Sequence, residues 1–183
     1  HGLSTVSAPL GGVDFLGDHF IAGIYLHAPF VWIHSGSATV LLVQAVNLAC
    51  TAPAVYLIAR HYKAPPLFSL ALALAGGLSF GLQSAAFFDS HEICFGFGFL
   101  AWGIWAFETK RLGWATLLFF AFSFFIESLG AYLVGLGLLA VYRAYQNKER
   151  RSALYGGLWM VFVVVWFVLV NRVFMPHFRA QGK

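Results

Sequence analysis

Charged side chains are scarce in this chain. They make up 10% of its 183 residues, whereas hydrophobic residues make up 60%. A soluble domain carries about 25% charged residues, so this sequence has too few of them to cover a globule with a polar surface. The shortage excludes a soluble globular protein and indicates an integral membrane protein.

Other absences narrow the function. The two cysteines, Cys50 and Cys94, lie in apolar stretches and form neither a disulfide framework nor a CxxC site. The net charge of +4 comes from basic residues in short clusters between apolar runs, which is the pattern of membrane orientation and excludes nucleic acid as a partner. No signal-peptide pattern follows His1, and we expect further sequence upstream.

The apolar runs predict an all-α fold, a polytopic transmembrane helix bundle of about six spans, because crossing the membrane takes about 20 apolar residues. Pro53 is expected to kink the first span. A single helix over 112–142 would be too long, and only a hairpin there puts the basic clusters on one side, the cytoplasm. The predicted spans are 38–59, 66–86, 91–107, 112–126, 128–142 and 153–174.

Residues 1–37 are then expected to form an extracytoplasmic loop ahead of the bundle at 38–183. Within that loop, 20–33 is apolar but too short to cross. We expect a short helix in the outer interface, interrupted at Pro29 and anchored by Tyr25 and Trp32.

Acids and histidines gather on the outer side of this topology. The outer acids are Asp14, Asp18, Asp89, Glu92 and Glu127, and the outer histidines are His1, His19, His27, His34, His91 and His177. Such a cluster on one face of an apolar protein indicates a functional site.

Two of these groups have alternative interpretations. Glu127 is either a hairpin cap at the headgroups or an acid that lines a cavity. Asp89 and Glu92 have the spacing of a capping box for the helix at 91–107, which leaves His91 unexplained. Asp89 and His91 could also hold a divalent metal ion, although a metal site needs more than two ligands.

Small residues at helical spacing predict packing contacts. Gly77 with Gly81, and Ala131 with Gly135, each form a small-xxx-small pair. Such pairs let helix backbones approach closely in a membrane.

Two motifs carry a family resemblance. FLGDHF at 15–20 and FDSHE at 88–92 resemble motifs of a family of bacterial predicted membrane proteins of unknown function. Gln44, LIARHY at 57–62 and NRVFMPHFR at 171–179 fit the same resemblance.

That family is distantly similar to the GT-C glycosyltransferases, which use polyprenyl-phosphate sugars. The resemblance implies an enzyme of the bacterial inner membrane acting at its outer face, with a polyprenyl-phosphate lipid and a divalent metal ion as partners of the site. It implies catalytic roles for Asp18, Asp89 and Glu127, and binding roles for His19, His91, Glu92 and Arg172. This chain has Ile126 and Ser128 where the family has a lysine and a second acid.

A non-catalytic subunit of a larger membrane complex, respiratory or photosynthetic, is the alternative. The 20 Phe, 7 Tyr and 6 Trp residues and the short half-helices would suit a chain packed against other membrane subunits. A transporter is the third class, but no inverted repeat is visible.

Overall fold

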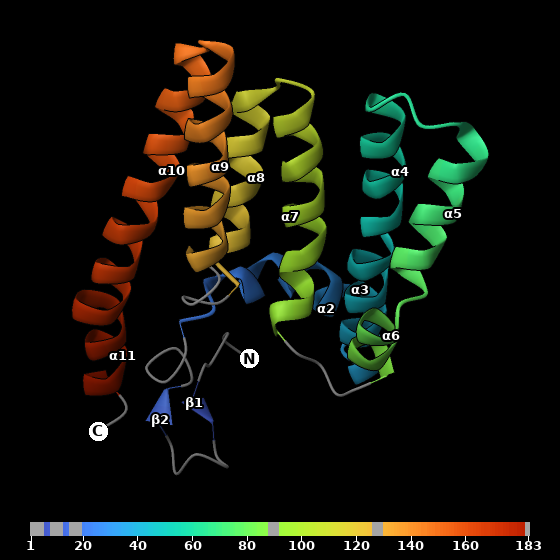
Figure 1. Ribbon diagram of the computed structural model, residues 1–183. Helices are drawn as coiled ribbons and strands as arrows, with labels where there is room; N and C mark the ends of the chain where they lie inside the picture. The colour runs from blue at the N-terminus through green and yellow to red at the C-terminus, as the bar shows by residue number, and fades with distance from the viewer. Residues whose placement is uncertain (1–5, 8–12, 15–19, 88–91, 126–129, 182–183) are drawn as a thin grey trace. The chain divides into compact units, whose positions relative to one another are not determined.

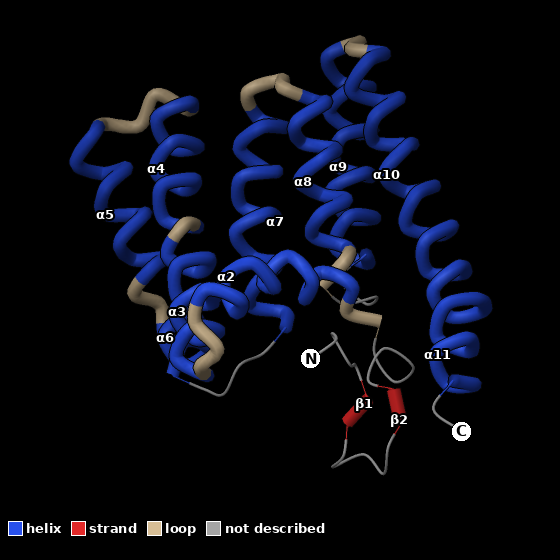
Figure 2. The backbone as a smooth tube through the Cα atoms, turned by 180° about the vertical axis from the view of Figure 1, so that it is seen from behind, coloured by secondary structure: helices blue, strands red, loops and turns tan. Residues whose placement is uncertain are grey.

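The computed structural model describes residues 6–7, 13–14, 20–87, 92–125 and 130–181 of the chain. These residues divide into two compact units. Unit 1 is His1–Ala22 with Ser123–Lys183, and unit 2 is Gly23–Phe122. Figures 1 and 2 show their elements from opposite sides.

Unit 2 is helical. A 3-10 helix, η2 (Ala22–His27), leads directly into α2 (Ala28–Ile33). Pro29 is the second residue of α2, where a missing N–H costs no helical hydrogen bond. Tyr25 and Trp32, the expected anchors, are both exposed. The remaining helices are α3 (Ser37–Ala49), α4 (Thr51–His61), α5 (Pro66–Gly77), α6 (Phe80–Phe87), α7 (Glu92–Glu108) and α8 (Leu112–Ser123).

The first apolar run is broken at Cys50, between α3 and α4. Pro53 explains the position of the break, because its ring replaces the N–H that would bond to the Ala49 carbonyl and crowds that carbonyl. Both α3 and α4 pack against α7.

Unit 1 holds a helix pair and a small strand pair. The pair is α9 (Gly130–Asn147) and α10 (Arg150–Leu169), which pack side by side in both views (Figures 1 and 2). A π-helix, η4 (Val170–Phe174), and α11 (Met175–Gln181) continue α10. Strands β1 (Val6–Ser7) and β2 (Val13–Asp14) pair antiparallel, and β2 contacts α11.

The all-α fold class is confirmed, with the β1–β2 pair as an addition that the sequence analysis did not predict. Two helical stretches are long and apolar enough to cross a membrane: Ser37–His61, which is α3 and α4 taken together, and Arg150–Phe178, which is α10 with η4 and the first residues of α11. Three shorter apolar helices accompany them: Pro66–Gly77, Cys94–Glu108 and Leu112–Ser123. The number of spans stays a prediction.

The helix boundaries differ from the predicted spans in informative ways. The apolar run 66–86 is two helices, because α5 ends at Gly76–Gly77 and a break at Leu78–Ser79 precedes α6. Glycines stabilise a helix poorly, which explains the break. The run 112–142 is also two helices: α8 ends at Ser123, and α9 begins at Gly130 and continues to Asn147.

One of the expected glycines lies at a helix contact, because a Cβ on Gly77 of α5 would lie 3.5 Å from the Ala52 Cβ of α4. The closest approach of two helix backbones, however, uses glycines that were not expected. A Cβ on Gly137 of α9 would lie 2.8 Å from the Gly156 carbonyl oxygen of α10, and one on Gly156 would lie 2.6 Å from the Gly137 oxygen. Among the described residues, a Cβ on Gly81 or Gly135 would meet nothing within 4 Å. Among the described residues, Gly81 and Gly135 therefore do not make the predicted packing contact, whereas Gly137 and Gly156 bring the backbones of α9 and α10 together.

Candidate functional site

Most of the predicted site residues lie outside the described residues. Glu92 is the first residue of α7, but its side chain is also outside them. Arg172 is described and lies in η4. The residues outside are Asp18, His19, Asp89, His91 and Glu127.

Arg172 lies in the middle of an unusual turn of helix. The Met175 N–H bonds to the Val170 carbonyl, five residues back, which is the π-helical pattern. Pro176 explains it, since a proline cannot donate to the carbonyl four residues before it, which is that of Arg172. Single π-turns within α-helices are frequent at functional sites, and the Arg172 side chain is exposed.

An aromatic cluster packs around this turn in unit 1. Phe20 stacks on Phe174 with ring centroids 5.1 Å apart and meets the edge of Trp166 at 5.8 Å. Phe124 meets Trp166 from another side at 4.6 Å. We call this set the aromatic cluster: Phe20, Phe124, Phe162, Trp166, Phe174 and Phe178.

Trp166 is the centre of the cluster. Its indole N–H donates to the Ser123 carbonyl at 3.2 Å, so the first residue of the second segment of unit 1 is bonded to the side of α10. The cluster joins three chain segments that are adjacent in sequence to predicted site residues: Phe20 follows His19, Phe124 is three residues before Glu127, and Phe174 is two residues after Arg172. Packing and one hydrogen bond therefore hold the three described segments, at Phe20, Phe124 and Phe174, together.

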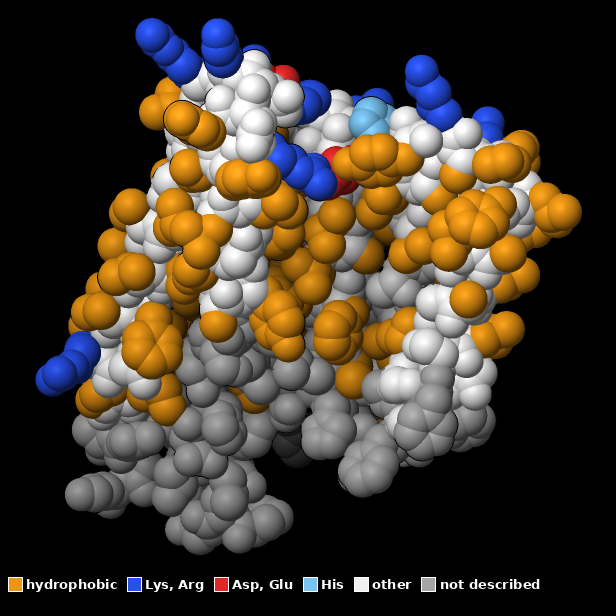
Figure 3. Space-filling view, in the orientation of Figure 1, with side chains coloured by type: hydrophobic (Ala, Val, Ile, Leu, Met, Phe, Trp, Pro, Cys, Tyr) orange, Lys and Arg blue, Asp and Glu red, His pale blue; other side chains and the backbone are white. Residues whose placement is uncertain are grey.

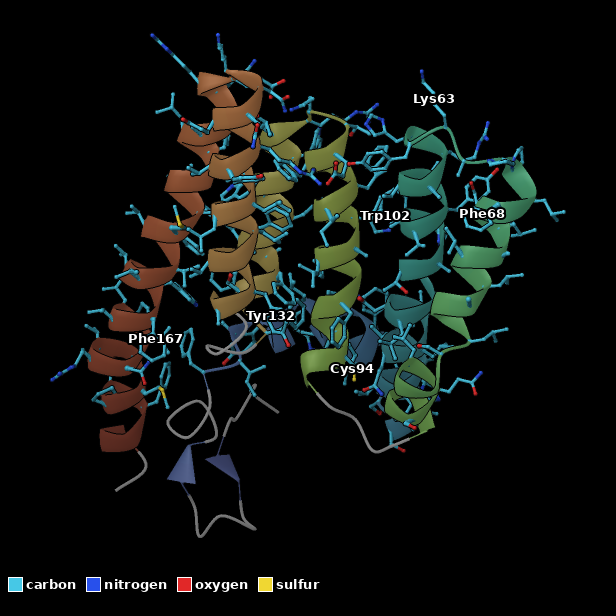
Figure 4. All side chains as sticks on the ribbon, in the orientation of Figure 1. Lys63, Phe68, Cys94, Trp102, Tyr132 and Phe167 are labelled. Atoms are coloured by element: carbon cyan, nitrogen blue, oxygen red, sulfur yellow. The ribbon has the colours of Figure 1, made fainter. Side chains whose placement is uncertain are left out.

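A second polar feature lies within unit 2, between α3–α4 and α7. The Gly98 N–H donates to Asn47 Oδ1 at 2.9 Å, and Trp102 Nε1 donates to the Cys50 carbonyl at 3.0 Å. Figure 4 shows Trp102 between α7 and α4. Trp102 thus satisfies a carbonyl at the helix break that Pro53 creates.

Sequence reasoning missed Asn47, Gly98 and Trp102. A polar asparagine within an apolar run was the available signal, because such a side chain needs a partner in a membrane. Gln44, one turn earlier, is 1% exposed and belongs to the same buried side of α3. Asn47 and Trp102 hold α7 against α3 and the α3–α4 break, so the role of these residues is structural.

The described residues contain no group of three or more His, Cys, Asp or Glu side chains that could hold a metal ion. Asp89 and His91, the predicted pair, lie outside the described residues. The metal therefore remains an expectation from the sequence.

The comparisons with known proteins give a family. The whole chain, residues 1–183, matches the family described as "Predicted membrane protein (DUF2079)". No curated protein and no solved structure matches the chain. The chain therefore belongs to this family of predicted membrane proteins, and its apolar helices are those of such a protein.

Proposed function

We propose that this protein binds a polyprenyl-phosphate lipid at the outer face of a bacterial inner membrane, as a GT-C-like glycosyltransferase would. The aromatic cluster of unit 1 carries this proposal. It joins the segments beside Asp18 and His19, beside Glu127 and around Arg172. The described segments that it joins, at Phe20, Phe124 and Phe174, are separated by about 100 and 50 residues in the sequence.

Arg172 is the phosphate contact in this proposal. Its guanidinium is exposed at a turn that Pro176 distorts, and guanidinium groups bind phosphate oxygens through paired, charge-assisted hydrogen bonds. Among the residues that the structure describes, no hydrogen bond or ion pair engages its side chain. The exposed Val173 beside it offers apolar surface to a prenyl chain.

The acids supply the proposed chemistry. One of Asp18, Asp89 and Glu127 acts as a general base that takes a proton from an acceptor hydroxyl. The hydroxyl oxygen then attacks the sugar carbon, and the lipid phosphate leaves with the bonding electrons. His19, His91 and Glu92 bind substrate, and a metal ion held by Asp89 and His91 would offset the negative charge of the leaving phosphate.

The proposal rests on the predicted topology. Residues 1–37 form the outer loop, and 38–183 form about six spans whose basic turns face the cytoplasm. The helix ends at His61, Glu108 and Asn147 each lie at a basic cluster of the sequence, which supports this orientation.

Binding can be tested separately from transfer. The full chain would be reconstituted in nanodiscs and titrated with a labelled polyprenyl phosphate. Arg172→Gln is expected to weaken binding by about 10-fold or more, since a hydrogen bond to a charged group contributes about 1.5–3 kcal/mol. Arg172→Lys should retain part of the affinity, and Arg150→Gln, at a predicted inner turn, should leave it unchanged.

Transfer is tested with a labelled polyprenyl-phosphate sugar. Loss of transfer in Asp89→Asn with binding retained would support the catalytic role. Equal binding by the Arg172→Gln and Arg150→Gln variants would contradict the phosphate site. Binding without any transfer would remove the enzymatic part and favour a non-catalytic subunit.

A further inference from the structure

Two lysines of unit 2 share a backbone conformation that glycine usually occupies. Lys63 follows the end of α4 and has φ 62°, and Lys110 follows the end of α7 and has φ 63°. In this left-handed region the Cβ of an L-residue crowds the backbone, so glycine is the residue that fits without strain.

The hydrogen bonds at both turns demand that conformation. The Ala64 N–H donates to the Ala59 carbonyl at 3.1 Å, and the Arg111 N–H donates to the Ala106 carbonyl at 2.8 Å. These six-to-one bonds define a Schellman motif, whose left-handed position is most often glycine. A lysine at both positions, in a chain with 19 glycines, indicates that the side chain is kept for its charge.

The charge at this end of unit 2 is strongly positive. Glu108 is the acid of these turns, and it accepts a hydrogen bond from the Tyr62 hydroxyl, which ties the end of α7 to the end of α4. The Arg111 guanidinium lies 4.7 Å from the centre of the Trp105 ring, which holds it beside the turn. The cations at this end are Arg60, Lys63, Lys110 and Arg111.

Exposed apolar side chains lie in the first helical turn that follows each pair of cations. Leu67 and Phe68 in the first turn of α5 are 79% and 56% exposed, and Trp114 in the first turn of α8 is 63% exposed. Figure 4 shows Lys63 at the α4–α5 turn and Phe68 just below it on α5. Figure 3 shows the same sequence of surfaces in unit 2, with Lys and Arg at the end and hydrophobic side chains beneath.

A cation next to apolar surface matches a ligand with an anionic head and an acyl tail. We propose that the α4–α5 and α7–α8 turns of unit 2 each bind the headgroup of an anionic phospholipid, with Lys63 and Lys110 on the phosphate. The acyl chains lie against Leu67 and Phe68 at one turn and against Trp114 at the other. This lies beyond the proposed outer-face function, because these turns are the predicted inner ones.

Orientation alone does not explain the two positions. The positive-inside rule needs lysines near the ends of spans, and any position of the turn would satisfy it. Both lysines stand where the backbone strains a side chain, which points to a role for the lysine at that position of the turn.

The test uses the full chain in nanodiscs of phosphatidylcholine, with and without phosphatidylglycerol. Lys63→Gly and Lys110→Gly are expected to raise the unfolding temperature in phosphatidylcholine, because glycine relieves the strain. They should also weaken phosphatidylglycerol binding, by about five-fold for each lysine near an anionic surface. The proposal therefore expects each glycine variant to unfold at a higher temperature in phosphatidylcholine and to bind phosphatidylglycerol more weakly.

Charge is tested apart from strain by a matched pair. Lys63→Arg and Lys63→Gln both keep a Cβ at the left-handed position, but only the arginine keeps the charge. The proposal expects phosphatidylglycerol to stabilise the arginine variant as much as the natural protein, and the glutamine variant less. If the glycine variants do not insert into nanodiscs, the arginine and glutamine variants still test the proposal.

Two results would overturn the proposal. The first is an equal stabilisation by phosphatidylglycerol of the natural protein, the glycine variants and Lys63→Gln. In that case the lysines would serve only to orient the protein in the membrane. The second is an equal stabilisation by soluble glycerol phosphate in phosphatidylcholine discs, which would identify a soluble phosphate ester as the ligand instead of a lipid.

Discussion

Replacing Gly156 by alanine should separate α9 from α10. The added Cβ would lie 2.6 Å from the Gly137 carbonyl oxygen and 2.9 Å from the Ala140 Cβ. Ordinary contact begins at 3.4 Å, and a backbone carbonyl in the middle of a helix cannot rotate away. The two helices would have to move apart, and the buried contacts along them would loosen.

The magnitude follows from two opposing effects. Overpacking costs about 1–3 kcal/mol, and the rigid backbone neighbour places this site at the upper end. Alanine in place of glycine favours a helix by about 1 kcal/mol. We therefore expect Gly156→Ala to lower the free energy of unfolding by about 2 kcal/mol, from the difference between these two estimates.

Gly157 is the matched control. It is the next residue of the same helix, and a Cβ there would meet nothing within 4 Å in the described part of the chain. Gly157→Ala keeps only the helix-propensity gain, about 1 kcal/mol. Gly156→Ala should therefore lower the free energy of unfolding, and Gly157→Ala should raise it.

Thermal unfolding of the detergent-purified protein measures both. Trp159, fully buried one turn from Gly156, supplies a fluorescence signal close to the perturbed contact. For a chain of this size, 1 kcal/mol corresponds to about 2–4 °C in Tm. Equal shifts for the Gly156 and Gly157 variants would refute the close packing of α9 and α10.

Three further predictions concern other contacts. Gly98→Ala should lower the free energy of unfolding by about 2 kcal/mol because its Cβ would meet the Asn47 side chain and, at 3.1 Å, the Asn47 carbonyl; a thermal double-mutant cycle with Asn47→Ala should show coupling between the two positions. Trp102→Phe removes the indole donor from a carbonyl at the helix break and should cost about 1 kcal/mol by the same assay, while an unchanged Tm would contradict that bond. Phe20→Ala should cost about 3 kcal/mol because Phe20 is 8% exposed, whereas Phe167→Ala, at 51% exposed, should cost less than 1 kcal/mol; proteolysis of unit 1 checks this pair, and equal cleavage would argue against the cluster.

Several features of the fold could be read from local sequence. The broken helix at Cys50 follows from Pro53, and the first residue of α7, Glu92, is one residue from the predicted start of that span. The break after Gly76–Gly77 had a visible signal in the two glycines, but composition alone treated 66–86 as one apolar run. Local signals of this kind predict where a helix is weak, and the surroundings decide whether it breaks.

The contacts between helices could not be predicted in the same way. Both small-xxx-small motifs were chosen by spacing, yet the α9–α10 contact uses Gly137 and Gly156. A motif describes one helix face, whereas packing depends on which face the partner helix covers and in which register. The Asn47–Gly98 and Trp102–Cys50 bonds join residues 51 and 52 positions apart, a separation at which sequence spacing carries no geometric information.

The candidate site shows the same division. Its acids and histidines were selected from residue type and predicted topology, and Arg172 from a motif resemblance. The aromatic cluster was not predicted, because phenylalanines are abundant throughout the chain and none is distinguished by its neighbours. Only the packing of Phe20 and Phe124 on Trp166 joins the segments beside the predicted residues.

The sequence by itself determined that this is an apolar, helical membrane protein with basic turns, since transfer into a bilayer depends on the sum of side-chain properties along each segment. The tertiary structure decided which glycines allow close approach, which carbonyl Trp102 satisfies, and that Lys63 and Lys110 occupy left-handed positions. The first two outcomes depend on distances between atoms of different helices, which are set only when the helices pack together. The third depends on the direction in which the chain leaves one helix to reach the next.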